Sequence, residues 1–322
     1  MEHKFISFKN NAFTYTGVWQ SDNSDEILSY STASQLSFGF IGGFVELFYR
    51  KISGNNVKIY LDGERIEAQK SDKDSYIITA NEAEHQIKFI IEQHSQIAFK
   101  GIVVENAGNI FQIKNNYYIQ FIGDSITDAY PGFSRKTAIS LNADYSIVSA
   151  CGMALVDRWG WYKLPENSEY RIGIETLYFS IGTHLQPKSL SKYRFEKCRT
   201  PDLFVIFVGT NDYINAAEQK IRGNLEVFAE KYLSFIGKIR GIFPEKPIVI
   251  LNDINKNEYR MEAIERAVSC ISKQHSNIYM IDSNDWNVET FENDVHPTEN
   301  GYDTMAKELT KAIKNIIRSN SN

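Results

Sequence analysis

Hydrophobic and polar positions follow two different patterns along the chain, and the pattern changes near residue 112. Before that point, short runs rich in β-branched and aromatic residues are separated by clusters of Gly, Asn, Asp and Ser. Such runs are typical of β-strands joined by turns. We predict strands at residues 13–19, 44–49, 57–61, 76–79, 87–91 and 97–104. Because no convincing helical stripe occurs here, these strands predict a β-sandwich of the jelly-roll kind.

From about residue 113, continuous apolar strands alternate with amphipathic helices. Strands are expected at 118–122, 145–148, 203–208, 248–251 and 278–281, and helices around 221–239, 261–271 and 302–316. This alternation is typical of a parallel sheet covered on both faces. We therefore predict two domains, a β-sandwich at 1–112 and an α/β domain with a five-stranded parallel sheet at 113–322. Residues 157–200 have the weakest pattern, and we expect an elaborated loop region there.

Composition and charge exclude several classes of partner. With 43% hydrophobic and 23% charged residues, the chain has the composition of a folded globular protein. The net charge of −5 and the lack of a long basic run argue against nucleic acid as a partner. No apolar stretch is long enough for a membrane span, so we expect no membrane partner. Without a recognisable signal peptide, the chain as written is expected to be cytoplasmic, whereas a trimmed chain would be secreted or periplasmic. The sequence does not indicate an oligomeric state.

The cysteines and histidines narrow the chemistry further. Three cysteines lie far apart, so the sequence encodes neither a disulfide framework nor a CxxC metal site: Cys151, Cys198 and Cys270. We expect free thiols, no metal and no cofactor. Apart from one histidine discussed below, we expect the histidines at the surface: His3, His85, His94, His184 and His275.

Polar residues follow the ends of the predicted parallel strands, where α/β sheets bind their ligands. Gly-Asp-Ser-Ile-Thr occupies 123–127 after the first strand, and Gly-Thr-Asn-Asp occupies 209–212 after the third. Asp-Val-His-Pro occupies 294–297, just before the last helix. A serine hydroxyl is a weak nucleophile and needs a base within hydrogen-bond reach. We predict that Ser125 attacks a carbonyl carbon and that His296 is its base.

Attack on a carbonyl also requires donors for the oxyanion that forms. We predict that these are the backbone N–H groups of Ser125 and Gly152 and the side-chain amide of Asn211. Gly152 follows the second strand, where a small residue lets the backbone approach a substrate. A helix N-cap for Ser125 and a turn position for Asn211 are the structural alternatives, but the occurrence of these motifs together favours catalysis. We expect Asp124 to accept hydrogen bonds from local backbone amides.

These ordered motifs resemble those of the SGNH, or GDSL, hydrolases. The resemblance rests on residues 123–127, Gly152, residues 209–212 and Asp-x-His-Pro at 294–297. The preceding β-sandwich, with Phe-Thr-Tyr-Thr-Gly-Val-Trp at 13–19 and Phe-Lys-Gly-Ile at 99–102, resembles carbohydrate esterase family 2, whose members deacetylate plant-type polysaccharides. The resemblance implies a flavodoxin-like catalytic domain, an acyl-serine intermediate, no metal, and an acetylated carbohydrate as substrate. It implies a serine esterase that removes acetyl groups.

The acid that orients His296 departs from the commonest arrangement of these hydrolases. Most of them place an acid three residues before the histidine, where this chain has Asn293. Asp294, two residues before His296, matches carbohydrate esterase family 2. Some members of that family are understood to orient the histidine with a main-chain carbonyl. The sequence leaves open whether the Asp294 carboxylate or a backbone carbonyl does so here.

Three tryptophans are candidates for stacking on a sugar ring: Trp159, Trp161 and Trp286. Packing explains them about as well. Two other functions also remain open. One is an esterase or thioesterase that acts on lipid or other acyl substrates, which an exposed apolar groove would favour. The other is a catalytically impaired carbohydrate-binding protein, whose serine would not react with an organophosphonate.

Overall fold

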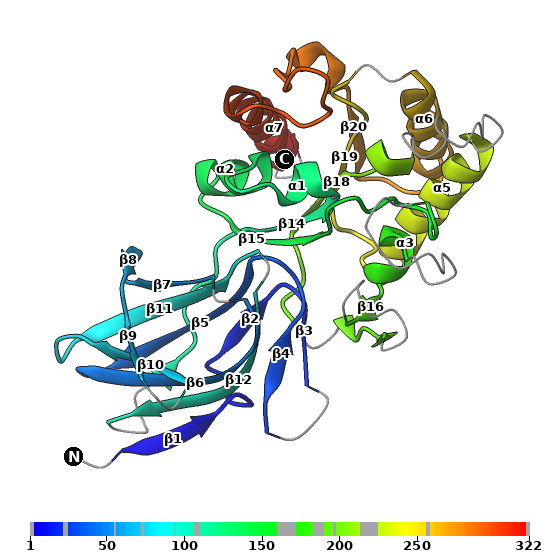
Figure 1. Ribbon diagram of the computed structural model, residues 1–322. Helices are drawn as coiled ribbons and strands as arrows, with labels where there is room; N and C mark the ends of the chain where they lie inside the picture. The colour runs from blue at the N-terminus through cyan, green and yellow to red at the C-terminus, as the bar shows by residue number, and fades with distance from the viewer. Residues whose placement is uncertain are drawn as a thin grey trace. The chain divides into compact units, whose positions relative to one another are not determined.

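The computed structural model describes residues 3–21, 25–54, 56–71, 74–93, 95–105, 110–159, 172–182, 190–195, 198–212, 225–255 and 258–319. Contacts divide the chain into two compact units (Figure 1). The sandwich unit comprises Met1–Asn116 and Tyr193–Thr200, and the α/β unit comprises Tyr117–Lys192 and Pro201–Asn322. The domain boundary that we predict at residue 112 stays a prediction.

The sandwich unit contains two antiparallel sheets. In the first, the strand order is β3 (Trp19–Gln20), β4 (Ile27–Ser29), β12 (Gln96–Val104), β6 (Phe44–Ser53), β10 (Ser75–Thr79) and β9 (Gln69–Ser71), with β1 (Lys4–Ser7) also paired to β12. In the second, it is β13 (Ile110–Phe111), β5 (Ser34–Ile41), β11 (Glu84–Ile91), β7 (Val57–Leu61) and β8 (Glu64–Ile66), with β2 (Thr14–Thr16) also paired to β5. The predicted β-sandwich is therefore confirmed.

Alternating side chains build the sandwich core. On β6, Val45, Leu47 and Tyr49 are buried, while the residues between them are partly exposed. The buried residues join the core cluster with alternate residues of β5 and β11, among them Phe38 and Phe89. A period of two places one face of each strand in the core, which explains why strands with this alternation pack as two layers.

Some details of the sandwich differ from the prediction. The expected strand at 13–19 is two strands, β2 and β3, separated by a bend at residues 17 and 18. The sequence analysis missed β5, because its Ser and Gly residues resemble a turn although the strand is buried at all but its last position. The expectation of a surface position for His85 is wrong, since its side chain is buried and its Nδ1 lies 2.7 Å from Asp62 Oδ2.

The α/β unit has a parallel sheet of five strands. Their order is β15 (Asp144–Ser149), β14 (Tyr118–Gly123), β18 (Leu203–Phe207), β19 (Ile248–Leu251) and β20 (Ile278–Ile281). In sequence order this is 2-1-3-4-5, the flavodoxin-like arrangement. The central strands β14, β18 and β19 are buried along their whole length, as expected for a sheet with both faces covered. The predicted fold class is confirmed.

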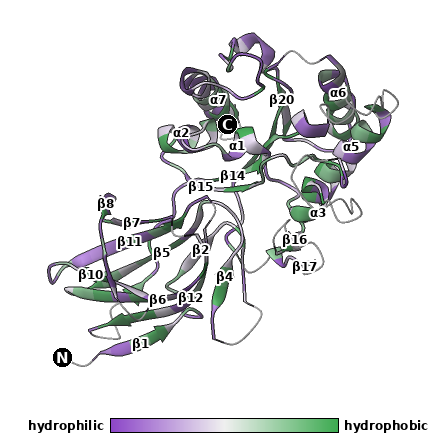
Figure 2. Cartoon of the chain, viewed as in Figure 1, coloured by the Kyte–Doolittle hydropathy of each residue, from purple (hydrophilic) through white to green (hydrophobic). Residues whose placement is uncertain are grey.

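Helices cover the two faces of this sheet. Within the described residues the helices are α1 (Ser125–Asp128), α2 (Phe133–Ser140), α3 (Ile174–Leu177), α5 (Leu225–Ile242), α6 (Glu258–Ser272), the 3-10 helix η4 (Asn284–Trp286) and α7 (Glu299–Ser319). α2 packs with α7 and α5 packs with α6, on opposite sides of the sheet (Figure 1). Figure 2 shows green and purple residues along α7, whose Met305, Leu309 and Ile313 are buried. No helix in the described ranges is both long and apolar enough to cross a membrane.

The region expected to be an elaborated loop contains short elements where it is described. These are α3 and an antiparallel pair formed by β16 (Ser180–Ile181) and β17 (Ser191–Lys192). Trp161 and His184 lie outside the described residues.

Candidate active site

The carboxyl end of β14 presents Ser125. The strand ends at Gly123, and Asp124 caps α1 by accepting a hydrogen bond from Ile126 N to Oδ1 at 3.1 Å. Ser125 is therefore the first residue of the helix instead of its cap, and its side chain lies in a partly buried position. The predicted local role of Asp124 is confirmed. Burial of this carboxyl raises its pKa.

A folded-back segment before α7 holds His296. Thr290 pairs with Pro297 in an antiparallel bridge. The Phe291 N–H donates to the His296 carbonyl at 3.0 Å, and the Thr298 N–H donates to the Glu289 carbonyl at 3.0 Å. These backbone bonds hold the backbone of His296 relative to the start of α7.

Ser125, His296 and Asp294 form one hydrogen-bonded chain. Ser125 Oγ lies 2.8 Å from His296 Nε2. His296 Nδ1 lies 2.6 Å from Asp294 Oδ1, and the same carboxylate oxygen accepts from the His296 backbone N–H at 3.1 Å. The hydrogen bond from the His296 side chain lowers the pKa of Asp294, so this carboxyl is ionised at neutral pH. A carboxylate at Nδ1 favours the tautomer with its proton there, which leaves Nε2 as the acceptor for the serine hydroxyl.

Asn211 and Asp212 hold the segment that follows Gly152. Asn211 Nδ2 donates to the Met153 carbonyl at 2.9 Å, which engages one of the two N–H groups of the amide. The backbone of Gly152 has a φ of +72°, a conformation that glycine adopts without strain. The structure thus ties two of the predicted oxyanion donors, Gly152 and Asn211, to one short segment.

Asp212, the last residue of the Gly-Thr-Asn-Asp motif, is a candidate site residue to which the sequence analysis assigned no role of its own. It is 3% exposed, and it accepts hydrogen bonds from Leu155 N at 2.7 Å and Val156 N at 3.0 Å. Burial raises the pKa of Asp212 to about 7, although the two backbone N–H groups and the Arg260 guanidinium favour its charged form. Its place at the end of the Gly-Thr-Asn-Asp motif was a signal. Arg260, in contrast, lies on α6 in a stretch without a motif.

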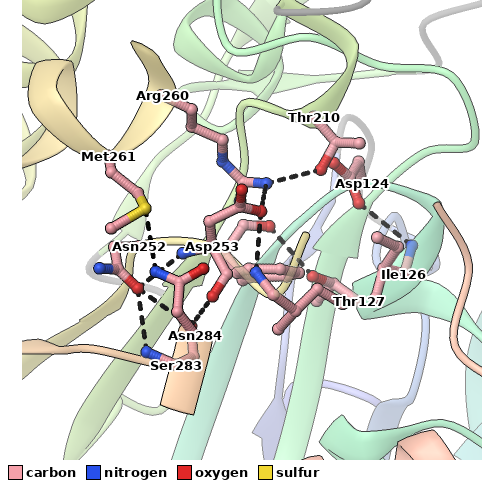
Figure 3. A network of polar contacts seen from close by, with 12 residues as sticks. Asp124, Ile126, Thr127, Thr210, Asn252, Asp253, Arg260, Met261, Ser283 and Asn284 are labelled. Atoms are coloured by element: carbon pink, nitrogen blue, oxygen red, sulfur yellow. Dashed lines mark hydrogen bonds and ion pairs between the residues drawn. The ribbon is translucent and has the colours of Figure 1, made fainter. Parts of the chain in front are cut away.

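Figure 3 shows the polar network around Arg260 at the ends of β18 and β19. Arg260 Nη1 donates to Thr210 Oγ1 and to Asp253 Oδ1. Next to it, Asn252 Oδ1 accepts hydrogen bonds from Ser283 N at 2.9 Å and from Ser283 Oγ at 3.2 Å. This network joins the ends of β18, β19 and β20.

The tryptophans are less defined. Trp159 and Trp286 are partly buried, and Trp286 ends the 3-10 helix η4. Trp161 lies outside the described residues. A substrate-binding role for the three tryptophans stays a prediction.

The described residues contain free cysteines and no cluster of metal-ligand side chains. The three cysteines are free, as predicted. Partial burial and the nearby carboxyls of Asp128 and Asp124 raise the pKa of Cys151, which keeps its thiol protonated and weakly nucleophilic. Among the described residues, no group of three or more His, Cys, Asp or Glu side chains has an arrangement that could hold a metal ion.

Comparisons with known proteins identify the family of this chain. The sequence profile of the GDSL-like Lipase/Acylhydrolase family matches residues 119–309, more than half of the chain. An acetylxylan esterase / glucomannan deacetylase from Cellvibrio japonicus (strain Ueda107) is 22% identical over 262 residues, which cover 74% of this chain and 68% of that protein.

Two solved structures share the fold of the whole chain. A family two carbohydrate esterase from Cellvibrio japonicus has a TM-score of 0.73 and 17% identity, with 98% of each chain covered. A family two carbohydrate esterase from Clostridium thermocellum, in complex with cellohexaose, has a TM-score of 0.68 and 18% identity, with 95% of this chain and 99% of that chain covered. On the family match, this chain belongs to the GDSL-like lipase/acylhydrolase family and is a carboxylic ester hydrolase.

Proposed function

We propose that this chain removes acetyl groups from carbohydrate through an acyl-serine intermediate. The observation that carries the proposal is the hydrogen-bonded chain from Ser125 through His296 to Asp294, with 2.8 Å between Ser125 Oγ and His296 Nε2. A serine beside an oriented imidazole is the arrangement that activates a hydroxyl for attack on an ester carbonyl. In this proposal the Asp294 carboxylate, at 2.6 Å from Nδ1, is the group that orients His296.

In the first half of the reaction, Ser125 Oγ attacks the acetyl carbonyl carbon as its proton passes to His296 Nε2. The oxyanion accepts hydrogen bonds from the backbone N–H groups of Ser125 and Gly152 and from the Asn211 amide. When the tetrahedral intermediate collapses, the bond to the sugar oxygen breaks, and that oxygen takes the proton from Nε2. The sugar leaves as an alcohol, and the acetyl group remains on Ser125.

In the second half, a water molecule attacks the acetyl carbon and gives a proton to His296 Nε2. The new tetrahedral intermediate breaks the bond to Ser125 Oγ, which takes that proton back. Acetate leaves, and the enzyme returns to its starting state.

The choice of carbohydrate as substrate is supported by the relatives. One is named an acetylxylan esterase / glucomannan deacetylase, and one solved structure of similar fold holds cellohexaose. We extend this proposal to Trp159, Trp161 and Trp286 as candidates for stacking on the sugar ring.

The test is acetate release from a panel of acetylated mono- and oligosaccharides. We expect the wild-type protein to release acetate and Ser125→Ala to lower kcat by at least about 10⁴-fold. The matched control is Ser140→Ala on α2, whose exposed hydroxyl donates to Lys136 O. This change should leave kcat unaltered.

Two outcomes would contradict the proposal. Faster turnover of octanoyl than of acetyl nitrophenyl esters would indicate a lipid or thioester substrate. A wild-type protein that binds sugar but releases no acetate, and whose Ser125 does not react with an organophosphonate, would be a carbohydrate-binding protein.

A further inference from the structure

Arg260 on α6 is a buried arginine that contacts two neighbouring strand ends of the α/β unit (Figure 3). Its side chain is 2% exposed. Nη1 donates to Thr210 Oγ1 at 2.9 Å and to Asp253 Oδ1 at 2.9 Å. The guanidinium also lies over the Phe207 ring, 4.7 Å from its centroid. A planar group held at both its edge and its face has one well-defined orientation.

The positive charge of this guanidinium acts on three buried carboxyl groups. Asp253 forms the ion pair with it. Burial raises the pKa of Asp124 and that of Asp212, and the Arg260 charge opposes the rise in both. Among the described residues, other titratable groups that act on this cluster are the side chains of Tyr232 on α5, His296 before α7, Tyr302 on α7 and Cys151 after β15.

One contact of Arg260, Thr210, and two carboxyl groups on which its charge acts, Asp124 and Asp212, adjoin the proposed oxyanion donors or the segment after Gly152. Thr210 directly precedes Asn211 in the chain. Asp124 directly precedes Ser125 and caps its helix. Asp212 accepts from the backbone at 155 and 156, shortly after Gly152. A shift of Arg260 would therefore act on all three donors.

We propose that Arg260 is a positioning residue that holds the three oxyanion donors in place. It does so through its hydrogen bond to Thr210 and through the attraction between its positive charge and the carboxylates of Asp124 and Asp212. This inference rests on the proposed function, because it concerns the same oxyanion. Arg260 does not touch the substrate in this proposal. It acts through Asn211, Ser125 and the segment after Gly152.

Substitutions separate the bond from the charge. Arg260→Lys keeps the positive charge but replaces the rigid guanidinium by a single ammonium group, which does not reproduce the planar contact with Thr210, Asp253 and Phe207. Thr210→Val removes the hydroxyl that accepts from Arg260 and that also hydrogen-bonds to the Asp124 carboxyl, and it leaves the Arg260 charge in place. Arg260→Met removes the charge and leaves Asp253 buried without it, so this variant is informative only if it folds.

The experiment measures kcat, KM and their pH dependence for an acetyl ester. We expect Arg260→Lys and Thr210→Val each to lower kcat about 10- to 100-fold, with KM within about twofold, because misplaced donors weaken transition-state binding more than substrate binding. The matched controls are Arg266→Lys on the exposed side of α6, and Thr310→Val, whose hydroxyl has no hydrogen-bond partner among the described residues. Both controls should keep wild-type kcat.

The pH profile tests the charge separately. In a protonated carboxyl the hydroxyl oxygen is a weaker acceptor than a carboxylate oxygen, so ionised Asp212 holds the amides of residues 155 and 156 more firmly than the protonated form. In Arg260→Met, we expect the pKa of Asp212, followed by carboxyl ¹³C NMR, to rise by at least about one unit. The rise of kcat with pH should move upward by the same amount. Thr210→Val should leave unchanged both the pKa of Asp212 and the pH at which kcat rises.

The inference is overturned if Arg260→Lys and Thr210→Val both keep kcat within twofold of the wild type, or if they raise KM as much as they lower kcat. If Arg260→Met does not fold, the kinetics of Arg260→Lys and Thr210→Val alone test the inference. Failure of the proposed function looks different, because the wild-type protein itself would then release no acetate. In that case the Asp212 pKa still tests the role of the Arg260 charge. A pKa that is the same in Arg260→Lys as in the wild type but higher in Arg260→Met supports this role. Equal pKa values in all three proteins overturn it.

Discussion

At the residue scale, Asp294 is about half exposed, yet one of its carboxylate oxygens accepts from both the ring and the backbone of His296. We predict that Asp294→Asn lowers kcat by about 10²-fold or more, because an amide does not stabilise the imidazolium as a carboxylate does. Steady-state kinetics between pH 6 and 9 measure this. Since its pKa is lowered, Asp294 stays ionised throughout that range.

Asp285→Asn, at an exposed acid in the preceding turn, is the control and should keep wild-type kcat. An Asp294→Asn protein with unchanged kcat would contradict the prediction. It would indicate that a main-chain carbonyl orients His296, the alternative that the sequence leaves open.

The buried carboxyl of Asp212 predicts an unusual pH dependence of stability. Its pKa of about 7 in the folded protein exceeds the ordinary value of 3.8, so between these pH values the folded protein holds a proton that the unfolded chain has lost. The stabilisation is complete below the lower value and is lost as the pH rises through the upper one, by on the order of 4 kcal/mol. Urea unfolding at pH 5 and pH 8 measures about 3 kcal/mol of this loss, because the remainder occurs below pH 5.

The variant Asp212→Asn has no charge to titrate, so it serves as the reference. We expect the free energy of unfolding of the wild type to fall more between pH 5 and pH 8 than that of Asp212→Asn. Parallel pH dependence in the two proteins would contradict an elevated Asp212 pKa.

The residues that could be predicted from the sequence are those whose chemistry is local to a motif. Ser125, Gly152, Asn211 and His296 each stand beside a strand end or helix start, and the fold brings Ser125 and His296 within hydrogen-bond distance. Arg260 could not be found in this way. Its partners, Thr210 and Asp253, follow different strands, so its role depends on tertiary packing that no spacing along the chain encodes.

At the element scale, the start of α7 supports the segment that carries His296. At Gly301, an added Cβ would lie 2.0 Å from the Glu289 carbonyl oxygen and 2.9 Å from Pro297 Cβ. We predict that Gly301→Ala displaces this segment, lowers kcat about 10-fold and costs about 1–3 kcal/mol of stability. Kinetics together with urea unfolding measure the two effects.

Gly241→Ala is the matched control, because Gly241 is also helical and its added Cβ would meet no atom within 4 Å. This change should keep kcat and raise stability by up to about 1 kcal/mol. If Gly301→Ala behaves in the same way as Gly241→Ala, the close approach of α7 to the His296 segment is not a constraint on catalysis.

How accurately a strand could be located from the sequence depends on which residues fill its buried faces. Strands β14, β18 and β19 are buried on both faces, so their sequences are uninterrupted apolar runs and could be located closely. Strand β5 is equally buried, but small polar residues fill its second face, and this mixture does not distinguish a strand from a turn. Pairing with β11 on one side and with β13 and β2 on the other makes β5 a central strand.

At the scale of the whole molecule, a single domain boundary does not separate the two units of the chain. Residues 193–200 return to the sandwich unit after the chain has entered the α/β unit. The Arg199 N–H donates to the Tyr15 carbonyl at 3.0 Å, and Cys198 Sγ donates to the Trp19 carbonyl at 3.2 Å. Because the sequence of this segment has no periodic pattern, its return could not be predicted.

This returning segment yields the last prediction. The Arg199 guanidinium donates to the Asn116 carbonyl, and its loss in Arg199→Ala should weaken the attachment of the segment by about 1–3 kcal/mol. We expect the backbone amides of residues 194 and 199 to exchange with deuterium about tenfold faster or more, as local opening becomes easier. Arg318→Ala, in the exposed last turn of α7, removes the same side chain without such a bond among the described residues and should leave these rates unchanged. Equal exchange in both variants would mean that Arg199 does not anchor the segment, and that Tyr15, Trp19 and Gln20 hold it without help from the guanidinium.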